Sequence, residues 1–328
     1  MRHSYNLTRR MACATGLAAA GLLLQAPAAA ADYPNGVVRI IASQAPGGAY
    51  DLVARTLAKE LSQRWHNAPV IVENRSGAEG TIAAGYVAKA KPDGLTLLLT
   101  GYGLVANKTL MGSRAAYELK DFTPVGMVAS PQLTVVVRSE SPITTLPQLI
   151  EESKKRDITV ATPGIGNPNH LTLAQIQSRT GGQFRQITYK GAAPALLGIL
   201  SGDTEAAVVA ITGALPQIRD GRLRALAVVG TTRSPTLPDV PTFQQSGLPF
   251  SGEPGWAGIL VPAGTPQAIV TEIQKQVAAS MADPEFRKVI VENGLNMLGS
   301  STQEFIAQID NDTARFPKLL TSIKADSQ

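Results

Sequence analysis

The sequence has few of the residues on which most catalytic and metal sites depend. Its 328 residues include one cysteine and three histidines. The single cysteine, Cys13, lies in an N-terminal segment that has the pattern of an export signal. If that segment is removed, the mature chain has no cysteine, which excludes disulfides, thiol nucleophiles and thiolate metal sites. No spacing of His, Asp and Glu suggests a metal site, and none is expected.

Residues 1–31 are predicted to form a cleaved export signal. Arg2 and Arg9–Arg10 give a positive start, residues 11–24 are apolar or small, and Ala29–Ala31 offers a small-residue cleavage site. The apolar stretch is too short to anchor the chain across a bilayer. Cys13 precedes most of that stretch, so a lipid anchor is not expected. The arginine pair also fits a twin-arginine signal loosely, so export by the general secretory or the twin-arginine route stays open.

A strongly basic surface is not expected in the mature protein. The formal net charge of the whole chain is +5, but the signal carries three arginines and no acidic residue, so the mature charge is +2. The basic character of the sequence is therefore partly that of the signal. It gives no argument for a nucleic-acid partner.

The most informative stretch is 45–51, Ala-Pro-Gly-Gly-Ala-Tyr-Asp. A strand-like apolar run over 37–42 leads into it, and a helix-like run over 52–61 leads out. Two glycines free the backbone to adopt positive φ, and the helix start adds unpaired N–H groups with a partial positive charge. Such a turn can hold a carboxylate or phosphate. It lacks the lysine of a Walker loop and is not G-x-G-x-x-G, so a tight turn capped by Asp51 is the alternative.

The same arrangement occurs again in the second half of the chain. A strand over 158–161 is followed by the glycine-containing loop 162–170 and then by a helix over 171–179. Two further loops follow strand-like runs: Gly101–Tyr102–Gly103, and Lys190–Gly191 ahead of a helix. These loops would stand at the carboxyl ends of strands, where open α/β sheets bind their ligands.

Strand-like and helix-like runs alternate along the mature chain, which predicts an α/β fold with mostly parallel sheets. Two strands, 133–137 and 256–261, are expected to carry the chain between two lobes. The first lobe is then 32–133 with 257–328, and the second is 134–256. The two glycine loops, one in each lobe, would face each other across a cleft.

Short motifs spread over about 290 residues resemble the Bug family of periplasmic solute receptors, the binding component of tripartite tricarboxylate transporters. The motifs that carry the resemblance are Tyr33–Pro34, Ala45–Gly48 with Asp51 and Arg55, Val72–Arg75 with Gly77–Ala78, Pro92–Gly94, Tyr189–Gly191, Pro238–Thr242, and Trp256 with Gly258, Pro262 and Thr265–Pro266.

The resemblance implies a two-lobed type II periplasmic-binding-protein (Venus flytrap) fold that closes on its ligand. It implies a periplasmic receptor, usually monomeric, with no cofactor and no enzymatic activity. The ligand would be a small organic acid, such as a di- or tricarboxylate, an acidic amino acid or an aromatic acid. Main-chain N–H groups of loops 44–51 and 162–170 would hold its carboxylate, and membrane permease subunits would receive it.

Seventeen residues are expected to line the ligand site. They are Gln44, Pro46, Gly47, Gly48, Ala49, Tyr50, Asp51, Gly101, Tyr102, Thr162, Gly164, Gly166, Asn167, Asn169, His170, Lys190 and Gly191. Several depart from the pattern that the resemblance implies: Gln44 replaces an aromatic residue, Tyr50 an Ala or Thr, Asn167 a Ser and Asn169 a His. These amide and phenol groups suggest polar contacts to the distal end of the ligand.

Four of these residues have a structural alternative. Asp51 either caps a helix or binds the ligand, and His170 either supports the loop or contacts the ligand. Tyr102 either stacks on the ligand or packs at the rim, and Lys190 either pairs with ligand charge or is simply exposed.

Two other function classes remain beside transport. A sensor would use the same fold to present its ligand to a signalling membrane protein. An exported enzyme is disfavoured by the scarcity of histidine and cysteine and the absence of G-x-S-x-G.

Overall fold

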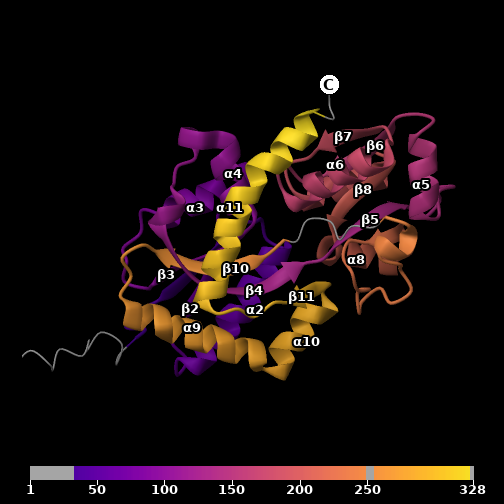
Figure 1. The fold of residues 1–328 in the computed structure, drawn as a ribbon. Helices are drawn as coiled ribbons and strands as arrows, with labels where there is room; N and C mark the ends of the chain where they lie inside the picture. Colours follow the sequence, from indigo (N-terminus) through magenta and orange to yellow (C-terminus); the bar gives the residue numbers. More distant parts are fainter. Residues whose placement is uncertain (1–32, 249–254, 326–328) are drawn as a thin grey trace, which may run out of the picture.

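The computed structural model describes residues 33–248 and 255–325. The predicted export signal, with Cys13, lies outside the described residues. Two sheets form the framework of two lobes (Figure 1). The first sheet has the order β11-β4-β10-β3-β1-β2 and contains β1 (Val38–Ala42), β2 (Val70–Asn74), β3 (Thr96–Gly101), β4 (Phe122–Pro131), β10 (Ala257–Pro262) and β11 (Leu295–Met297). The second has the order β7-β6-β8-β5-β9 and contains β5 (Leu133–Arg138), β6 (Ile158–Thr162), β7 (Phe184–Thr188), β8 (Ala206–Ala210) and β9 (Leu223–Val228).

Both sheets are mixed, which corrects the prediction of mostly parallel sheets. β1 pairs in parallel with β2 and β3, and β6 pairs in parallel with β7 and β8. The strands next to the crossing between the lobes, β4, β10 and β5, pair antiparallel with their neighbours. β4 leads the chain out of the first lobe and β10 leads it back in, which explains why these two strands run in opposite directions.

The helices cover both faces of each sheet. Those of the first lobe are α2 (Ala49–Arg64), α3 (Thr81–Val87), α4 (Gly103–Met111), α9 (Gln267–Ala282), α10 (Pro284–Glu292) and α11 (Thr302–Ala325). Those of the second are α5 (Leu146–Ser153), α6 (Pro168–Thr180), α7 (Ala192–Ser201) and α8 (Ile211–Arg219). α4, α8 and β11 were not predicted from the sequence. Gly101–Tyr102–Gly103 was predicted to be a loop, whereas Gly101 ends β3 and Gly103 begins α4.

Alternation along β1 shows how the first lobe is layered. Ile40 and Ile41 are both fully buried, because successive strand residues point to opposite faces of a sheet that is covered on both sides. Ile40 belongs to the cluster formed with α2, α9 and α10. Ile41 belongs to the cluster formed with α3, α4 and α11. The connections to the following helices lie at the carboxyl edge of the sheet, where β1 and β3 end.

The first crossing between the lobes is at Gln132, the one residue between β4 and β5. Its buried backbone is held from both sides: its N–H donates to Gly294 of the first lobe at 3.4 Å, and its carbonyl accepts from Ile211 of the second at 2.8 Å. The second crossing precedes β10, and residues 249–254 lie outside the described part.

Helix α11 extends from the first lobe to the second; it is the long yellow helix in Figure 1 and lies against β4, α4 and α6. Its buried Asp312 accepts a hydrogen bond from the indole N–H of Trp256 at 2.9 Å. Burial raises the pKa of the Asp312 carboxyl, although that bond and one from Gln308 oppose the rise. The Phe305 ring meets Trp256 edge-on at 4.9 Å. Trp256 is therefore fixed beside the second crossing.

We expect Gly258→Ala to destabilise the protein, because a Cβ at residue 258 would collide with the buried Phe305 ring. The loss should be about 1–3 kcal/mol in a urea melt, as for other overpacked cores. Gly213→Ala is the matched control, since its Cβ would meet only the end of the Leu196 side chain. Equal stabilities for the two variants would contradict the packing described for β10.

Candidate functional site

The candidate site lies where the strand order reverses in each sheet. In the first sheet the chain goes from β1 to β2 on one side and then to β3 on the other, so the reversal falls between β1 and β3. In the second sheet it falls between β6 and β8. Ligands of open α/β sheets bind outside the carboxyl ends of strands at such points. The predicted glycine loops follow β1 and β6, and therefore lie at both reversals.

Asp51 holds the first loop together. Its carboxylate is buried and accepts from the Gly47 N–H at 2.9 Å, from Arg55 Nε at 3.1 Å and from Asn74 Nδ2 at 2.8 Å. Burial by itself would raise the pKa of Asp51, but these hydrogen bonds outweigh it and lower the pKa. The residue therefore fixes the loop from the first turn of α2, rather than serving as the N-cap, which is Gly48.

Gln44 supplies an acceptor for the start of α2. Its Oε1 accepts from the Tyr50 N–H at 3.2 Å, six residues along the chain. The Gly48 N–H bonds to the Ala45 carbonyl at 3.2 Å, and Gly47 has a φ of +80°, a conformation that favours glycine. Gln44 thus faces the loop and the start of α2. The predicted contact between its amide and the distal end of a ligand stays a prediction.

The second loop is held in a similar way. Asn167 is the N-cap of α6, and its side chain accepts from the His170 N–H at 3.0 Å. The His170 Nδ1 accepts from the Gly166 N–H at 2.9 Å. Burial lowers the pKa of His170, which favours the neutral ring that can accept this bond. His170 therefore supports the loop, one of the two roles considered for it.

Two amide side chains that the sequence reading missed fix the loops from the neighbouring outer strands. Asn74, at the end of β2, donates to the Gln44 carbonyl at 3.0 Å as well as to Asp51. Gln186, on β7, donates to the Thr162 hydroxyl at 2.6 Å and to the Gly164 carbonyl at 3.5 Å. Asn74 lies within a motif of the family resemblance, whereas nothing in the sequence indicates Gln186, whose position depends on the β6–β7 register.

Contacts between the lobes bring the two loops to one region. Tyr102, directly after β3, is fully buried against Phe316 of α11, with ring centroids 5.7 Å apart, and against Leu171 of α6. A Cβ on Gly166 would collide with Leu110 of α4. Tyr102 therefore packs between the lobes rather than presenting its ring to a ligand.

The remaining predicted residues surround these loops. Pro46 is exposed and Ala49 is buried as the first residue of α2. Asn169 is buried, and its Nδ2 donates to the Val208 carbonyl at 3.0 Å. Gly191 is the N-cap of α7, and Lys190 is exposed beside it, at the same edge of the second sheet as the loop after β6.

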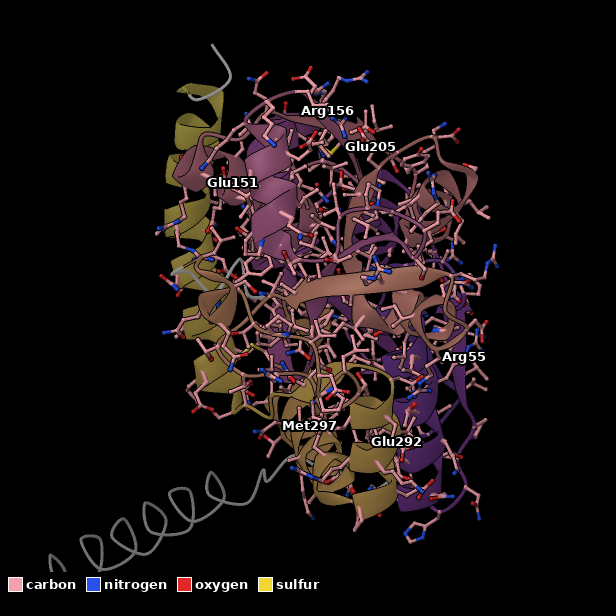
Figure 2. The ribbon with its side chains drawn as sticks, turned by 90° about the vertical axis from the view of Figure 1, so that its right-hand side faces the viewer. Arg55, Glu151, Arg156, Glu205, Glu292 and Met297 are labelled. Atoms are coloured by element: carbon pink, nitrogen blue, oxygen red, sulfur yellow. The ribbon has the colours of Figure 1, made fainter. Side chains whose placement is uncertain are left out.

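The ion pair between Arg156 and Glu205 lies away from the loops. Figure 2 shows the two side chains next to each other at one end of the molecule, with Arg55 at a distance. The Arg156 Nη2 is 2.8 Å from Glu205 Oε2, and Glu205 also accepts from the Thr159 N–H. This pair links the residues just before β6 to the residue just before β8.

Among residues 33–248 and 255–325, no group of three or more His, Cys, Asp or Glu side chains is placed to hold a metal ion. None of the helices that the structure describes combines the length and apolar character needed to cross a membrane.

The sequence profile of the tripartite tricarboxylate transporter receptor family, TctC, matches residues 53–324. The chain belongs to this family. BugT of Bordetella pertussis is 34% identical over 276 residues, which cover 83% of this chain and 84% of BugT. The predicted membership of the Bug family is thereby confirmed.

Two solved structures establish the fold. The periplasmic binding protein BugD superposes with a TM-score of 0.81 at 32% identity, over 89% of this chain and 99% of that one. The Rhodopseudomonas protein described as "R. palustris Rpa4515 with adipate" gives a TM-score of 0.84 at 29% identity, again over 89% and 99%. The two-lobed periplasmic-binding fold is confirmed, and this TctC-family chain is a solute receptor of that fold.

We expect Asp51→Asn to lower the free energy of unfolding at pH 7 by about 1.5–3 kcal/mol, the contribution of hydrogen bonds to a charged group. Because folding lowers the pKa of Asp51, its stabilisation is present above the unfolded value of about 3.9 and is lost as the pH falls through the folded pKa. Urea melts from pH 7 to pH 3 should show the two proteins converging.

Asp310→Asn, at an exposed position on α11, is the control and should follow wild type at every pH. A stability difference for Asp51→Asn that stays constant down to pH 3 would contradict the role given to the carboxylate.

Proposed function

We propose that this protein is a periplasmic receptor that binds a small carboxylate-bearing solute between its lobes and delivers it to the membrane permease of a tripartite tricarboxylate transporter. Main-chain N–H groups of loops 44–51 and 162–170 hold the acid group. The receptor acts as a monomer, without a cofactor and without catalysing a reaction. The proposed lobes are 32–133 with 257–328, and 134–256.

One observation carries the proposal: each lobe has a glycine loop followed by a helix N-terminus at its own strand-order reversal, and contacts between the lobes place both in one region. Helix N-termini favour anions through their N–H groups and their dipole. The solved relative with adipate, a dicarboxylate, is 29% identical and supports the ligand class. The family description supports a transporter as partner.

Binding at the first loop proceeds by exchange of acceptors. The Tyr50 N–H has a neutral acceptor in the Gln44 amide oxygen, at 3.2 Å. A ligand carboxylate that displaces this amide turns a neutral hydrogen bond, worth about 0.5–1.5 kcal/mol net, into a charge-assisted one worth about 1.5–3 kcal/mol. The freed Gln44 amide can then turn to water. The loop therefore binds a charged carboxylate more tightly than a neutral analogue of the same acid.

An exchange of acceptors contributes only the difference between a charge-assisted and a neutral bond, about 1 kcal/mol, whereas micromolar binding needs about 8 kcal/mol. The exchanges therefore favour a charged acid, and donors without an internal acceptor, at about 1.5–3 kcal/mol each, supply further affinity. Closure of the second lobe follows because its loop makes contacts to the ligand only in the closed state, and such differential contact shifts the equilibrium towards closure.

We expect Gly47→Val to abolish binding of carboxylates while the protein still melts cooperatively. Residue 47 has a φ of +80°, so a β-branched side chain there forces the loop into another conformation. Gly164→Val tests the second loop in the same way. Binding is measured by calorimetry and thermal shift against a panel of di- and tricarboxylates.

Gly181→Val is the control, since Gly181 also has a positive φ, +66°, and open space around its Cβ, but lies at the far end of α6. It should bind acids as wild type does. Unchanged affinity in both loop variants would remove the glycine loops from the site.

Gln44→Glu should weaken binding of carboxylates at pH 7 by tenfold or more. The new side chain places a tethered carboxylate on the Tyr50 N–H, so a ligand would have to displace a charged acceptor. Gln44→Ala, which removes the competing acceptor, should bind at least as tightly as wild type. Wild-type affinity in Gln44→Glu would show that the ligand does not use this N–H.

A further inference from the structure

The side chain of Tyr50 crosses the strand-order reversal of the first sheet. Tyr50 is the second residue of α2, and its phenol reaches over the end of β3 towards β10. Its Oη donates to the Trp256 carbonyl at 3.4 Å. The ring packs against the first-lobe core and remains partly exposed.

Gly101 leaves the space that the phenol occupies. Gly101 is the last residue of β3, and a Cβ there would collide with both the Tyr50 hydroxyl and the Trp256 carbonyl. Three segments far apart in the sequence therefore meet at one point, and only a residue without a side chain fits at the end of β3.

The second lobe fills the equivalent position with a shorter side chain. Asn169 is the second residue of α6, as Tyr50 is of α2, and it reaches over the reversal between β6 and β8 to bond the Val208 carbonyl at 3.0 Å. Asn169 is buried, whereas Tyr50 is partly exposed at the edge where the first loop lies. In each lobe, the second residue of the helix after the glycine loop thus covers the strand-order reversal, and its side chain is longer in the first lobe.

We infer that Tyr50 forms the end wall of the ligand crevice and sets the length of the acid that the receptor accepts. This inference rests on the proposed function, since it needs an acid group held at the adjacent loop. With its carboxylate on the N–H groups at the start of α2, an extended acid that pointed towards β3 would meet the phenol ring. In a pocket of fixed depth, one extra or missing methylene in the ligand changes the preference by roughly 10–200-fold.

The test compares linear dicarboxylates from succinate to suberate by calorimetry on wild type, Tyr50→Ala, Tyr50→Thr and Tyr50→Phe. The two small residues should move the preferred acid to a longer chain, with a gain of roughly tenfold or more for acids beyond the wild-type optimum. Tyr50→Phe, which keeps the ring, should retain the wild-type order. Tyr50→Thr serves if Tyr50→Ala does not fold, as judged by its melt.

Tyr86→Ala is the control, because Tyr86 is a partly exposed tyrosine of the same lobe whose ring stacks on Arg75. It should leave the length order unchanged. Folded Tyr50→Ala and Tyr50→Thr proteins that keep the wild-type order, or bind no member of the series more tightly than wild type, would overturn the inference. Gly47→Val separates this result from failure of the proposed function: loss of binding there, with an unchanged length order in the Tyr50 variants, would refute only the role of Tyr50.

Discussion

The first residues of a helix carry N–H groups that the helix cannot satisfy itself, and the candidate site is built around that constraint. In the first lobe, Gln44 and Asp51 supply acceptors to the loop and to the start of α2. In the second, Asn167 and His170 do so for α6. These internal acceptors keep both loops ordered before a ligand arrives. In the proposed function, recognition of an acid is then an exchange of acceptors, rather than the filling of an empty anion site.

Most of the fold follows from local signals in the sequence. The apolar runs around β1 and β6, each with a glycine loop and a helix after it, appear in the structure as predicted, although α2 and α6 each begin three residues earlier, at Ala49 and Pro168. The missed elements lack such signals. α4 and α8 begin without a capping side chain, and α8 contains Pro216. β11 has three residues and depends on pairing with β4, as between Leu295 and Pro131, which a local pattern does not reveal.

The candidate site was predictable in its loops but not in the side chains that hold them. The Asp51–Arg55 pair is four residues apart on one helix face and can be read from spacing. Asn74 and Gln186 reach the loops only because the register of their strands places them there. The Trp256 carbonyl meets Tyr50 across 206 residues of sequence. The contacts that position Gln44 and Tyr50, with the start of α2 and with the Trp256 carbonyl, could therefore not be predicted from the sequence.

The central claim is that main-chain N–H groups of two facing loops hold the acid group, and a crystal structure with a bound dicarboxylate tests it most directly. The account predicts carboxylate oxygens within hydrogen-bond distance of N–H groups in loops 44–51 and 162–170, with the Gln44 amide turned away from the Tyr50 N–H. A carboxylate seated elsewhere, or held by an arginine side chain, would contradict it.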